Sequence, residues 1–358
     1  MFFKIEARPE PSKAMKYFSP LVAALLMLFS GLIIFSLLGK DSIEAFYAFF
    51  IEPVNDLYGI GELFIKAAPL MLIGTGLAVG FRASIWNIGA EGQLAIGALF
   101  GGYIAIVFND NSGFFILPLM IVAGAVGGLL WASIPAFLRT VFNANEILVS
   151  LMLNYVAILL LGLLVHGPLK DPDGYGFPQS VLFSDSALLP ILMEGTRFHL
   201  GVLIAVVGVI VGWVLLQKSF TGYQIQVAGL AKNAASYAGF KYKKLIWIGL
   251  LSGGTAAGIA GVLEISGPIG QLLPTVSPGY GYAAIIVAFV GRLHPGGILL
   301  SSLLMALLYL GGESGQMNLD LPAAVTGVFQ GLLLFYLLAT DFLIDYRVCF
   351  SGFRKEAI

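Results

Sequence analysis

The chain has 358 residues, of which 58% are hydrophobic and 11% are charged, and its formal net charge at neutral pH is −1. Soluble proteins carry about 25% charged residues, so this composition leaves too little polar surface to face water and indicates a chain solvated largely by lipid. The near-neutral charge also argues against nucleic acid as a partner, because nucleic-acid binding needs a basic surface.

A membrane-spanning helix needs about 20 mostly apolar residues, and about ten stretches of the chain approach that requirement. In chain order they are Phe18–Leu38, Leu63–Val79, Ile88–Val107, Phe114–Leu138, Ile147–Val165, Leu200–Leu216, Leu245–Ile265, Tyr282–Val290, Ile298–Leu310 and Ala323–Leu338. The eighth and ninth are short, and the glycine-containing segment 291–297 between them predicts a broken pair. The sequence therefore predicts an all-α, polytopic membrane protein.

The basic residues indicate an orientation in the membrane. If the N-terminus is cytoplasmic, all of the 19 lysines and arginines fall on the inner side except Lys40, Lys66, Lys170 and Arg197. Positive charge gathers on the cytoplasmic side of membrane proteins, so we expect both termini inside. The expected organisation is a cytoplasmic N-terminal segment (residues 1–17), a single transmembrane domain (18–345) and a cytoplasmic tail (346–358).

Two further patterns concern packing. Many of the 45 glycines lie inside apolar runs such as Ile121–Leu130, where small residues let membrane helices approach closely. The outer segment Lys40–Glu62 has apolar residues recurring at helical spacing, which predicts an interfacial helix: Ile43, Phe46, Phe49 and Phe50.

The sequence carries no signature of catalysis. It has no G-x-x-x-x-G-K-[ST] loop, and His166, His199 and His294 have no nucleophile partner at a recognisable spacing. The single cysteine, Cys349, excludes an intrachain disulfide, and the three histidines are too far apart to suggest a metal cluster. We therefore expect no enzyme activity, no metal and no cofactor in this chain.

The densest polar motif is NIGAEGQ (residues 87–93), between the second and third spans. Its glycines permit a break in the backbone, while Asn87, Glu91 and Gln93 supply hydrogen-bonding groups at membrane depth. Ionisable residues at such a depth are rare, and they are candidates for a functional site. The alternative interpretation is a plain helix start, with Asn87 as the cap and Glu91 near the positive end.

Four other residues are candidates for the same site. Glu264 ends the seventh span, where a solvated carboxylate is the alternative, and Asn154 lies in the fifth span, where a hydrogen bond between helices is the alternative. Tyr280 and Tyr282 precede the eighth span, where they either stack on a flat solute or anchor the chain at the interface.

The inner segment 229–240 (GLAKNAASYAGF) differs in kind, because it is alanine-rich, has a glycine near each end and is followed by lysines. This composition favours a short helix on the cytoplasmic face that docks a soluble partner over a merely solvated loop. The residues expected at that contact are Gly229, Ala231, Asn233, Ala234, Ala235, Tyr237, Ala238 and Gly239.

Taken in order, NIGAEGQ, Asn145-Glu146-Ile147 with 151–155 (LMLNY), residues 231–240 and residues 279–297 resemble the permeases of one group of ABC transporters. That group serves branched-chain amino acids, ribose-type sugars and nucleosides. The resemblance runs from about Leu70 to Gly312, and NIGAEGQ is most similar to the longer of two paired permeases in bacterial nucleoside importers. One departure is Ala234, where many relatives carry proline after the asparagine.

The resemblance implies a multi-pass protein of the bacterial cytoplasmic membrane, with an importer fold related to the vitamin B12 type. Such a permease pairs with a second, shorter permease, docks a cytoplasmic ATPase through a coupling segment (229–241) and receives nucleoside from an extracellular solute-binding lipoprotein. ATP and Mg²⁺ then belong to the ATPase. The implied pathway or gate residues are Asn87, Glu91, Gln93, Asn154, Glu264, Tyr280 and Tyr282.

Two alternatives stay open at this point. The solute of the permease could be a ribose-type sugar, or the chain could be an ion-coupled secondary transporter in which Glu91 or Glu264 binds the ion. A membrane-embedded enzyme is disfavoured because no catalytic pair is visible.

Overall fold

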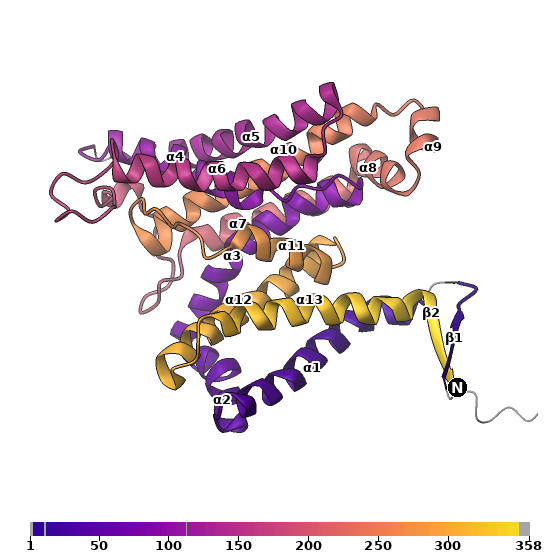
Figure 1. Ribbon diagram of the computed structural model, residues 1–358. Helices are drawn as coiled ribbons and strands as arrows, with labels where there is room; N and C mark the ends of the chain where they lie inside the picture. The colour runs from indigo at the N-terminus through magenta and orange to yellow at the C-terminus, as the bar shows by residue number, and fades with distance from the viewer. Residues whose placement is uncertain (1–2, 11, 112, 351–358) are drawn as a thin grey trace, which may run out of the picture. The chain divides into compact units, whose positions relative to one another are not determined.

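The computed structural model describes residues 3–10, 12–111 and 113–350 (Figure 1). The elements are β1 (Phe3–Ala7), α1 (Lys13–Leu37), α2 (Ser42–Phe50), α3 (Leu57–Arg82), α4 (Ala90–Val107), α5 (Ile116–Phe142), α6 (Glu146–His166), α7 (Leu200–Trp213), α8 (Phe220–Leu230), α9 (Lys232–Tyr237), α10 (Tyr242–Glu264), α11 (Tyr280–Val290), α12 (Pro295–Leu319), α13 (Ala324–Asp345) and β2 (Tyr346–Phe350). Short π-helical turns extend α7 to Lys218 and α10 to Ile269.

Nine helices of the described chain are long and apolar enough to cross a membrane, and the apolar helix α11 is shorter. The predicted broken pair is confirmed, because only residues 291–294 separate α11 from α12 and Arg292 and Leu293 there adopt positive φ angles. The prediction of an all-α fold with about ten spans is therefore confirmed. The cytoplasmic placement of both termini stays a prediction.

Short polar side chains set where several helices begin. Asp41 caps α2, Asp56 caps α3 and Asn145 caps α6, each accepting a backbone N–H of the first turn. Such caps satisfy donors that have no partner inside the helix. Because Asp56 starts α3 at Leu57, this helix is longer than the predicted span, which began at Leu63.

By their internal contacts the described residues form two compact units. Unit 1 contains the described parts of Met1–Pro53 and Leu308–Ile358, and unit 2 is Val54–Leu307. The helix α12 contributes residues to both. The expectation of one transmembrane domain over residues 18–345 stays a prediction.

In unit 1, α1 packs along α13, and an aromatic cluster closes the unit beside α2. The ring of Phe329 lies 5.6 Å from that of Phe35 and 4.9 Å from that of Phe49. The helix predicted in Lys40–Glu62 is thus confirmed as α2, and it buries Phe49 while leaving Ile43 exposed. Whether it lies in the membrane interface stays a prediction.

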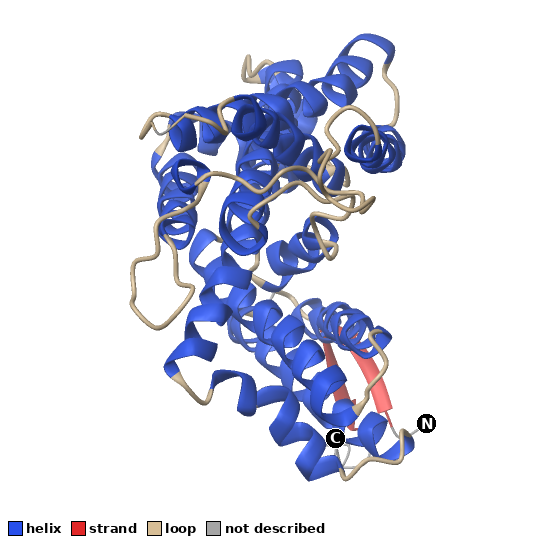
Figure 2. Cartoon of the chain, turned by 90° about the vertical axis from the view of Figure 1, so that its left-hand side faces the viewer, coloured by secondary structure: helices blue, strands red, loops and turns tan. Residues whose placement is uncertain are grey.

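The two ends of the described chain pair as an antiparallel two-stranded sheet, β1 with β2, drawn red in Figure 2. Neither strand was predicted, because each has its partner at the other end of the chain; the strands fall in the segments expected to be cytoplasmic (1–17 and 346–358). Arg347 forms an ion pair with Glu6 across the strands, at 2.8 Å. Residues 351–358 of the expected tail lie outside the described residues.

In unit 2, α10 packs against α3, α4 and α5 through glycine. A Cβ at Gly258 would lie 2.1 Å from the carbonyl oxygen of Gly124 in α5, and one at Gly254 would lie 2.5 Å from that of Gly128. A Cβ at Gly97 of α4 would lie 2.2 Å from the Cα of Gly258. The backbones of these helices touch only because glycine has no side chain. This is the close helix packing that the glycine-rich apolar runs predicted.

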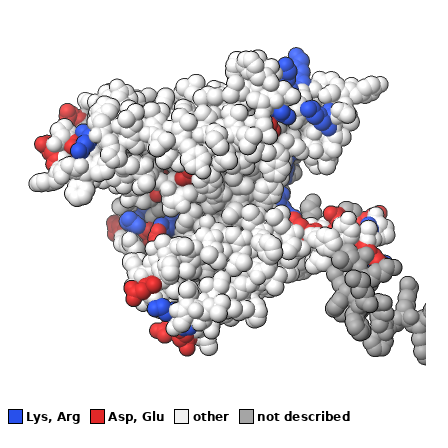
Figure 3. Space-filling model, viewed as in Figure 1, with Lys and Arg blue, Asp and Glu red and all other residues white. Residues whose placement is uncertain are grey.

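Charged side chains in Figure 3 lie mainly at the ends of the helices, and the surface between those ends is mostly uncharged. Exposed Val122, Val126 and Leu130 follow one face of α5 there, and Leu159 and Leu163 follow α6. An exposed apolar band of this kind needs lipid or another membrane protein to cover it.

Candidate functional site

The motif 87–93 is the point at which the backbone between α3 and α4 leaves helical geometry. α3 ends at Arg82, residues 83–89 are irregular, and α4 starts at Ala90 rather than at Ile88 as predicted. Gly89, not Asn87, is the N-cap residue, and the Oδ1 atom of Asn87 accepts the backbone N–H of Gly89 at 2.9 Å.

Asn87 and Gln93 form a reciprocal amide pair in the core of unit 2. The Nδ2 atom of Asn87 donates to Oε1 of Gln93 at 2.9 Å, and Nε2 of Gln93 donates to Oδ1 of Asn87 at 3.1 Å. Both side chains are buried. Buried amides need partners, and here each supplies the other, so the pair holds the irregular segment against the first turn of α4.

Asn154 joins three segments. Its Oδ1 atom accepts the N–H of Gly92 at 2.8 Å, while its Nδ2 atom donates to the carbonyl of Ile88 at 2.8 Å and to the hydroxyl of Tyr282 at 3.1 Å. This side chain therefore ties α6 to the start of α4 and to α11. Asn154 lies two turns from the start of α6, within the apolar part of that span. Because Asn154 bonds to the first turn of α4, α4 begins at the same depth in the membrane.

Glu91 lies in the first turn of α4 and is 6% exposed. Its Oε2 atom accepts the backbone N–H of Gly281 at 2.7 Å, and the Ser277 hydroxyl and Gly279 backbone also bond the carboxylate. A Cβ at Gly281 would lie 2.2 Å from the backbone nitrogen of Glu91, so this approach requires glycine. Glu91 thus holds the N-terminus of α11 against that of α4.

The exposed edge of this network consists of two tyrosines. Tyr282 on α11 is 38% exposed, and Tyr155 on α6, next to the buried Asn154, is 59% exposed. Further along α11, Phe289 stacks on Trp86 at 5.7 Å and on Phe81 at 5.4 Å. Tyr282 and Phe289 are seven positions apart and share one face of the helix. That face is lined by aromatic rings.

The structure brings Asn87, Glu91, Gln93, Asn154 and Tyr282 together, and Tyr280 is buried in the same first turn of α11. Glu264 is elsewhere. It is the last residue of α10 and is buried, about three turns beyond Gly253, the α10 residue that faces Asn87. Whether any of these residues contacts a solute stays a prediction.

The segment expected to dock a partner contains α9, preceded by α8. Ala231, Asn233, Ala234, Tyr237, Ala238 and Gly239 are exposed, with Tyr237 at 97%, whereas Ala235 is 1% exposed and Gly229 is half-buried. A Cβ at Gly229 would lie 1.9 Å from the carbonyl oxygen of Arg82, so α8 sits directly against the end of α3. The segment therefore rests on the helix that leads into residues 83–89.

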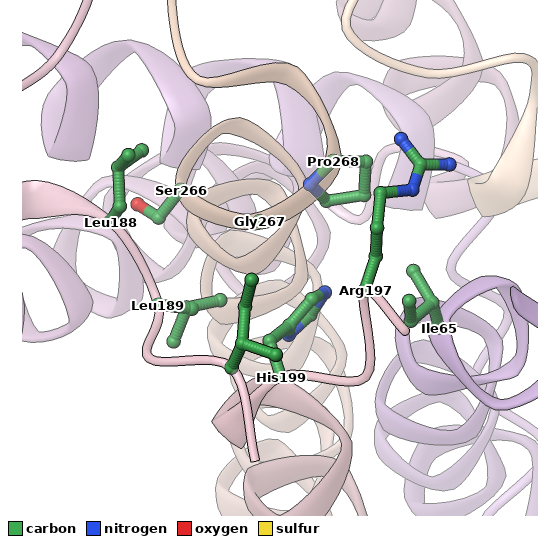
Figure 4. A pocket seen from close by; sticks show the side chains of 9 residues that line it. Ile65, Leu188, Leu189, Arg197, His199, Ser266, Gly267 and Pro268 are labelled. Carbon is green, nitrogen blue, oxygen red and sulfur yellow. The ribbon is translucent and has the colours of Figure 1, made fainter. Parts of the chain in front are cut away.

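A second polar cluster, which the sequence did not predict, lies where α3, α7 and the π-helical turn after α10 meet (Figure 4). Arg197 binds the buried carboxylate of Glu62 with two hydrogen bonds, at 2.8 and 2.6 Å. This carboxylate raises the pKa of Arg197 further above its ordinary value. The two residues are far apart in the sequence, so no local pattern indicates the pair.

His199 lies beside that pair and lines a pocket of about 130 Å³ with Ser266 and Gly267. Its Nδ1 atom accepts the N–H of Gly201 at 3.2 Å and so caps α7, and its Nε2 atom has no partner among the described residues. Burial lowers the pKa of His199 to about 4, against the influence of Glu62, which raises it. The imidazole is therefore neutral at physiological pH.

The structure combines three features: an apolar helical bundle, a buried polar network where α3 and α4 are separated, and the exposed helix α9 among lysines at one end. These features are typical of a membrane transport subunit. The chain belongs to the family of branched-chain amino acid transport system permease components, which matches residues 59–338. It is thus an ABC-transporter permease, a transport component rather than an enzyme.

Two relatives illustrate the range of the family. The chain is 35% identical to the glucose ABC transporter permease protein TsgB13 of Haloferax volcanii, over 95% of this chain and 91% of the relative. It is 28% identical to the guanosine ABC transporter permease protein NupP of Bacillus subtilis, over 88% of this chain and 91% of the relative. The family resemblance seen in the sequence is confirmed, and these names include both a sugar and a nucleoside.

Among solved structures, an inward-facing ABC transporter of the metal-chelate type is 18% identical, covers 90% of this chain and 99% of its own, and has a TM-score of 0.48. Two guanosine ABC transporter permease proteins of Bacillus subtilis, NupP and NupQ, are similar to this chain, as are two nucleoside ABC transporter permease proteins of Lactococcus lactis, NupB and NupC.

Proposed function

We propose that this chain forms half of the pore of an ATP-driven importer for nucleosides in the cytoplasmic membrane of a bacterium. The observation that carries this proposal is the exposed ring of Tyr282 on α11, held in place by the buried network of Asn87, Glu91, Gln93 and Asn154. A second, shorter permease completes the pore, a cytoplasmic ATPase supplies the energy and an extracellular lipoprotein delivers the solute.

In this proposal the buried polar residues position the pathway and the tyrosines contact the solute. Asn87, Gln93 and Asn154 bond to one another or to backbone, and Glu91 accepts the N–H of Gly281. Tyr155 and Tyr282 are the neighbours that face outward. Aromatic rings stack on the flat face of a nucleobase, which supports a nucleoside as the solute.

The ATPase docks on α9 in this proposal. Ala234 and Tyr237 are exposed on α9, and Ala238, the C-cap of the helix, is exposed beside them. α8 rests on the end of α3, and α3 leads into residues 83–89 and the network. A displacement of α9 on ATP binding would therefore reach the pathway through a continuous, closely packed path.

The test is solute uptake by the reconstituted complex. Vesicles containing both permeases, the ATPase and the lipoprotein should accumulate labelled guanosine only with ATP inside, and an ATPase variant unable to hydrolyse ATP should abolish uptake. Uptake without ATP or without the ATPase would instead support an ion-coupled transporter and contradict the proposal.

A sugar is the second candidate solute, because the glucose permease TsgB13 is 35% identical to this chain. The same vesicles decide between the two solutes by competition. For a nucleoside importer, unlabelled adenosine blocks the uptake of guanosine and glucose or ribose does not. The reverse pattern, with labelled glucose or ribose taken up, would assign the chain to sugar import.

A further inference from the structure

A basic pocket lies between the end of α5 and the start of α10, next to α9. It has a volume of about 340 Å³ and is lined by Arg139, Thr140, Val141, Asn143, Lys232, Tyr242, Lys243 and Ile246. Three of these residues are cationic and none is acidic. Figure 3 shows the lysines and arginines gathered at this end, at the upper right.

The charge of the pocket is only partly balanced by the protein. The Nε atom of Arg139 lies 3.1 Å from the carboxylate of Glu146, and Arg139 also donates to Oδ1 of Asn143 at 3.2 Å. Lys232 and Lys243 are both exposed, and the ammonium of Lys232 lies 4.4 Å from the Tyr242 ring centroid. The pocket therefore keeps an excess of about two positive charges, from the two lysines.

The surroundings of the pocket distinguish a lipid from a small anion. Val141, which lines it, is exposed, and Phe137 and Ile134 continue the same exposed apolar face one and two turns further along α5. α5 ends and α10 begins at this level, so the pocket lies where a spanning helix reaches the headgroups. Basic pockets between membrane helices bind anionic lipid headgroups.

We propose that this pocket binds the phosphate of an anionic phospholipid, such as phosphatidylglycerol or cardiolipin, with the acyl chains along the exposed face of α5. Lys232 is the first residue of α9, and Lys243 lies in the first turn of α10. The lipid thus holds α9 against the ends of α5 and α10. The inference does not depend on which solute the permease carries.

The test measures lipid binding to the delipidated, full-length permease in detergent, purified with its partner permease. Phosphatidylglycerol or cardiolipin should bind and raise the Tm more than phosphatidylcholine does. The double variant Lys232→Gln/Lys243→Gln should lose about 5-fold in affinity for each lysine, so about 25-fold together. Both lysines are exposed, so the variant should fold normally.

The matched control is Lys241→Gln/Lys244→Gln, which removes the same charge from exposed neighbours outside the pocket lining. It should bind anionic lipid nearly as well as the wild type. Equal losses in both double variants would show diffuse surface attraction and overturn the proposal. A Tm rise of the same size with soluble glycerol phosphate, or no preference over phosphatidylcholine, would overturn it as well.

Discussion

The side-chain amide of Asn154 on α6 donates to the hydroxyl of Tyr282 on α11 at 3.1 Å, and the same amide also bonds the backbone at the start of α4. A fully buried residue thus fixes the position of an exposed aromatic ring. In the proposed pathway Asn154 therefore positions the ring and Tyr282 contacts the solute, two roles that the sequence could not separate.

Asn154→Leu should destabilise the permease and abolish uptake. The substitution leaves the N–H of Gly92 and the carbonyl of Ile88 without partners in the core, at a cost of about 1–3 kcal/mol for each group. Thermal unfolding in detergent measures the loss. The control is Asn318→Leu, which removes an exposed amide bonded to Glu52. Equal Tm values for the two variants would contradict the role assigned to Asn154.

Tyr282→Ala should weaken solute affinity about tenfold, because it removes one stacking surface. Tyr282→Phe keeps the ring and should stay close to wild type, since Asn154 retains its bond to Ile88. The concentration dependence of uptake reports this difference as a change in KM. Tyr175→Ala, which removes a fully exposed tyrosine from the loop before α7, is the control. An unchanged KM in Tyr282→Ala would remove Tyr282 from the pathway.

Ala234→Asp and Ala238→Asp should abolish ATP-driven uptake without lowering the Tm of the permease. Both alanines are exposed, Ala234 on α9 and Ala238 at its C-cap, and a carboxylate there disrupts the proposed docking surface but not the fold. Pull-down of the ATPase and uptake are the measurements. Ala323→Asp, an exposed alanine at the N-cap of α13, is a matched control that should behave as wild type. Normal ATPase binding by the α9 variants would contradict the docking site.

Ala235→Asp should behave differently from its neighbours. Ala235 is 1% exposed, so an aspartate there buries a carboxylate under α9. We expect a lower Tm as well as lost uptake, which makes this variant unsuitable for testing docking. A Tm equal to that of Ala234→Asp would show that α9 packs differently.

His199 should make stability depend on pH. Its pKa is lowered from 6.5 to about 4 by burial, so the folded state favours the neutral imidazole. The contribution of His199 to the free energy of unfolding is fully present above pH 6.5, the pKa of the unfolded state. It is lost as the pH falls towards 4, by up to about 3 kcal/mol. Tm measured against pH checks it. His199→Asn keeps a cap for α7 and should flatten this part of the profile. Identical profiles would refute the assignment.

The apolar runs predicted about ten spans, because each span needs its own run, and the described residues contain nine long apolar helices and the shorter α11. The boundaries were less predictable. α3 begins at Leu57 because Asp56 caps it and because Arg197 neutralises Glu62, which is buried in its first turns. Arg197 follows Glu62 in the sequence only after three further helices, so this ion pair could not be predicted. α12 runs on to Leu319 through Glu313, where falling hydropathy predicted an end at Leu310.

The candidate site was predictable as a set of residues but not as a network. Asn87, Glu91, Gln93 and Asn154 stood out because polar groups inside apolar runs need partners. Their partners could not be read from the sequence, since Asn154 meets Tyr282 only because α6 and α11 both pack against α4. The pairing of β1 with β2 and the His199 cluster were missed for the same reason.

The account depends most on α9 facing the cytoplasm, where an ATPase can reach it. Tyr237 on α9 and Tyr175 in the loop before α7 are both 97% exposed and are predicted on opposite sides of the membrane. In a Cys349→Ser background, a membrane-impermeant maleimide should label Tyr175→Cys in intact cells and Tyr237→Cys only after permeabilisation. Labelling of Tyr237→Cys in intact cells would place α9 outside and contradict the account.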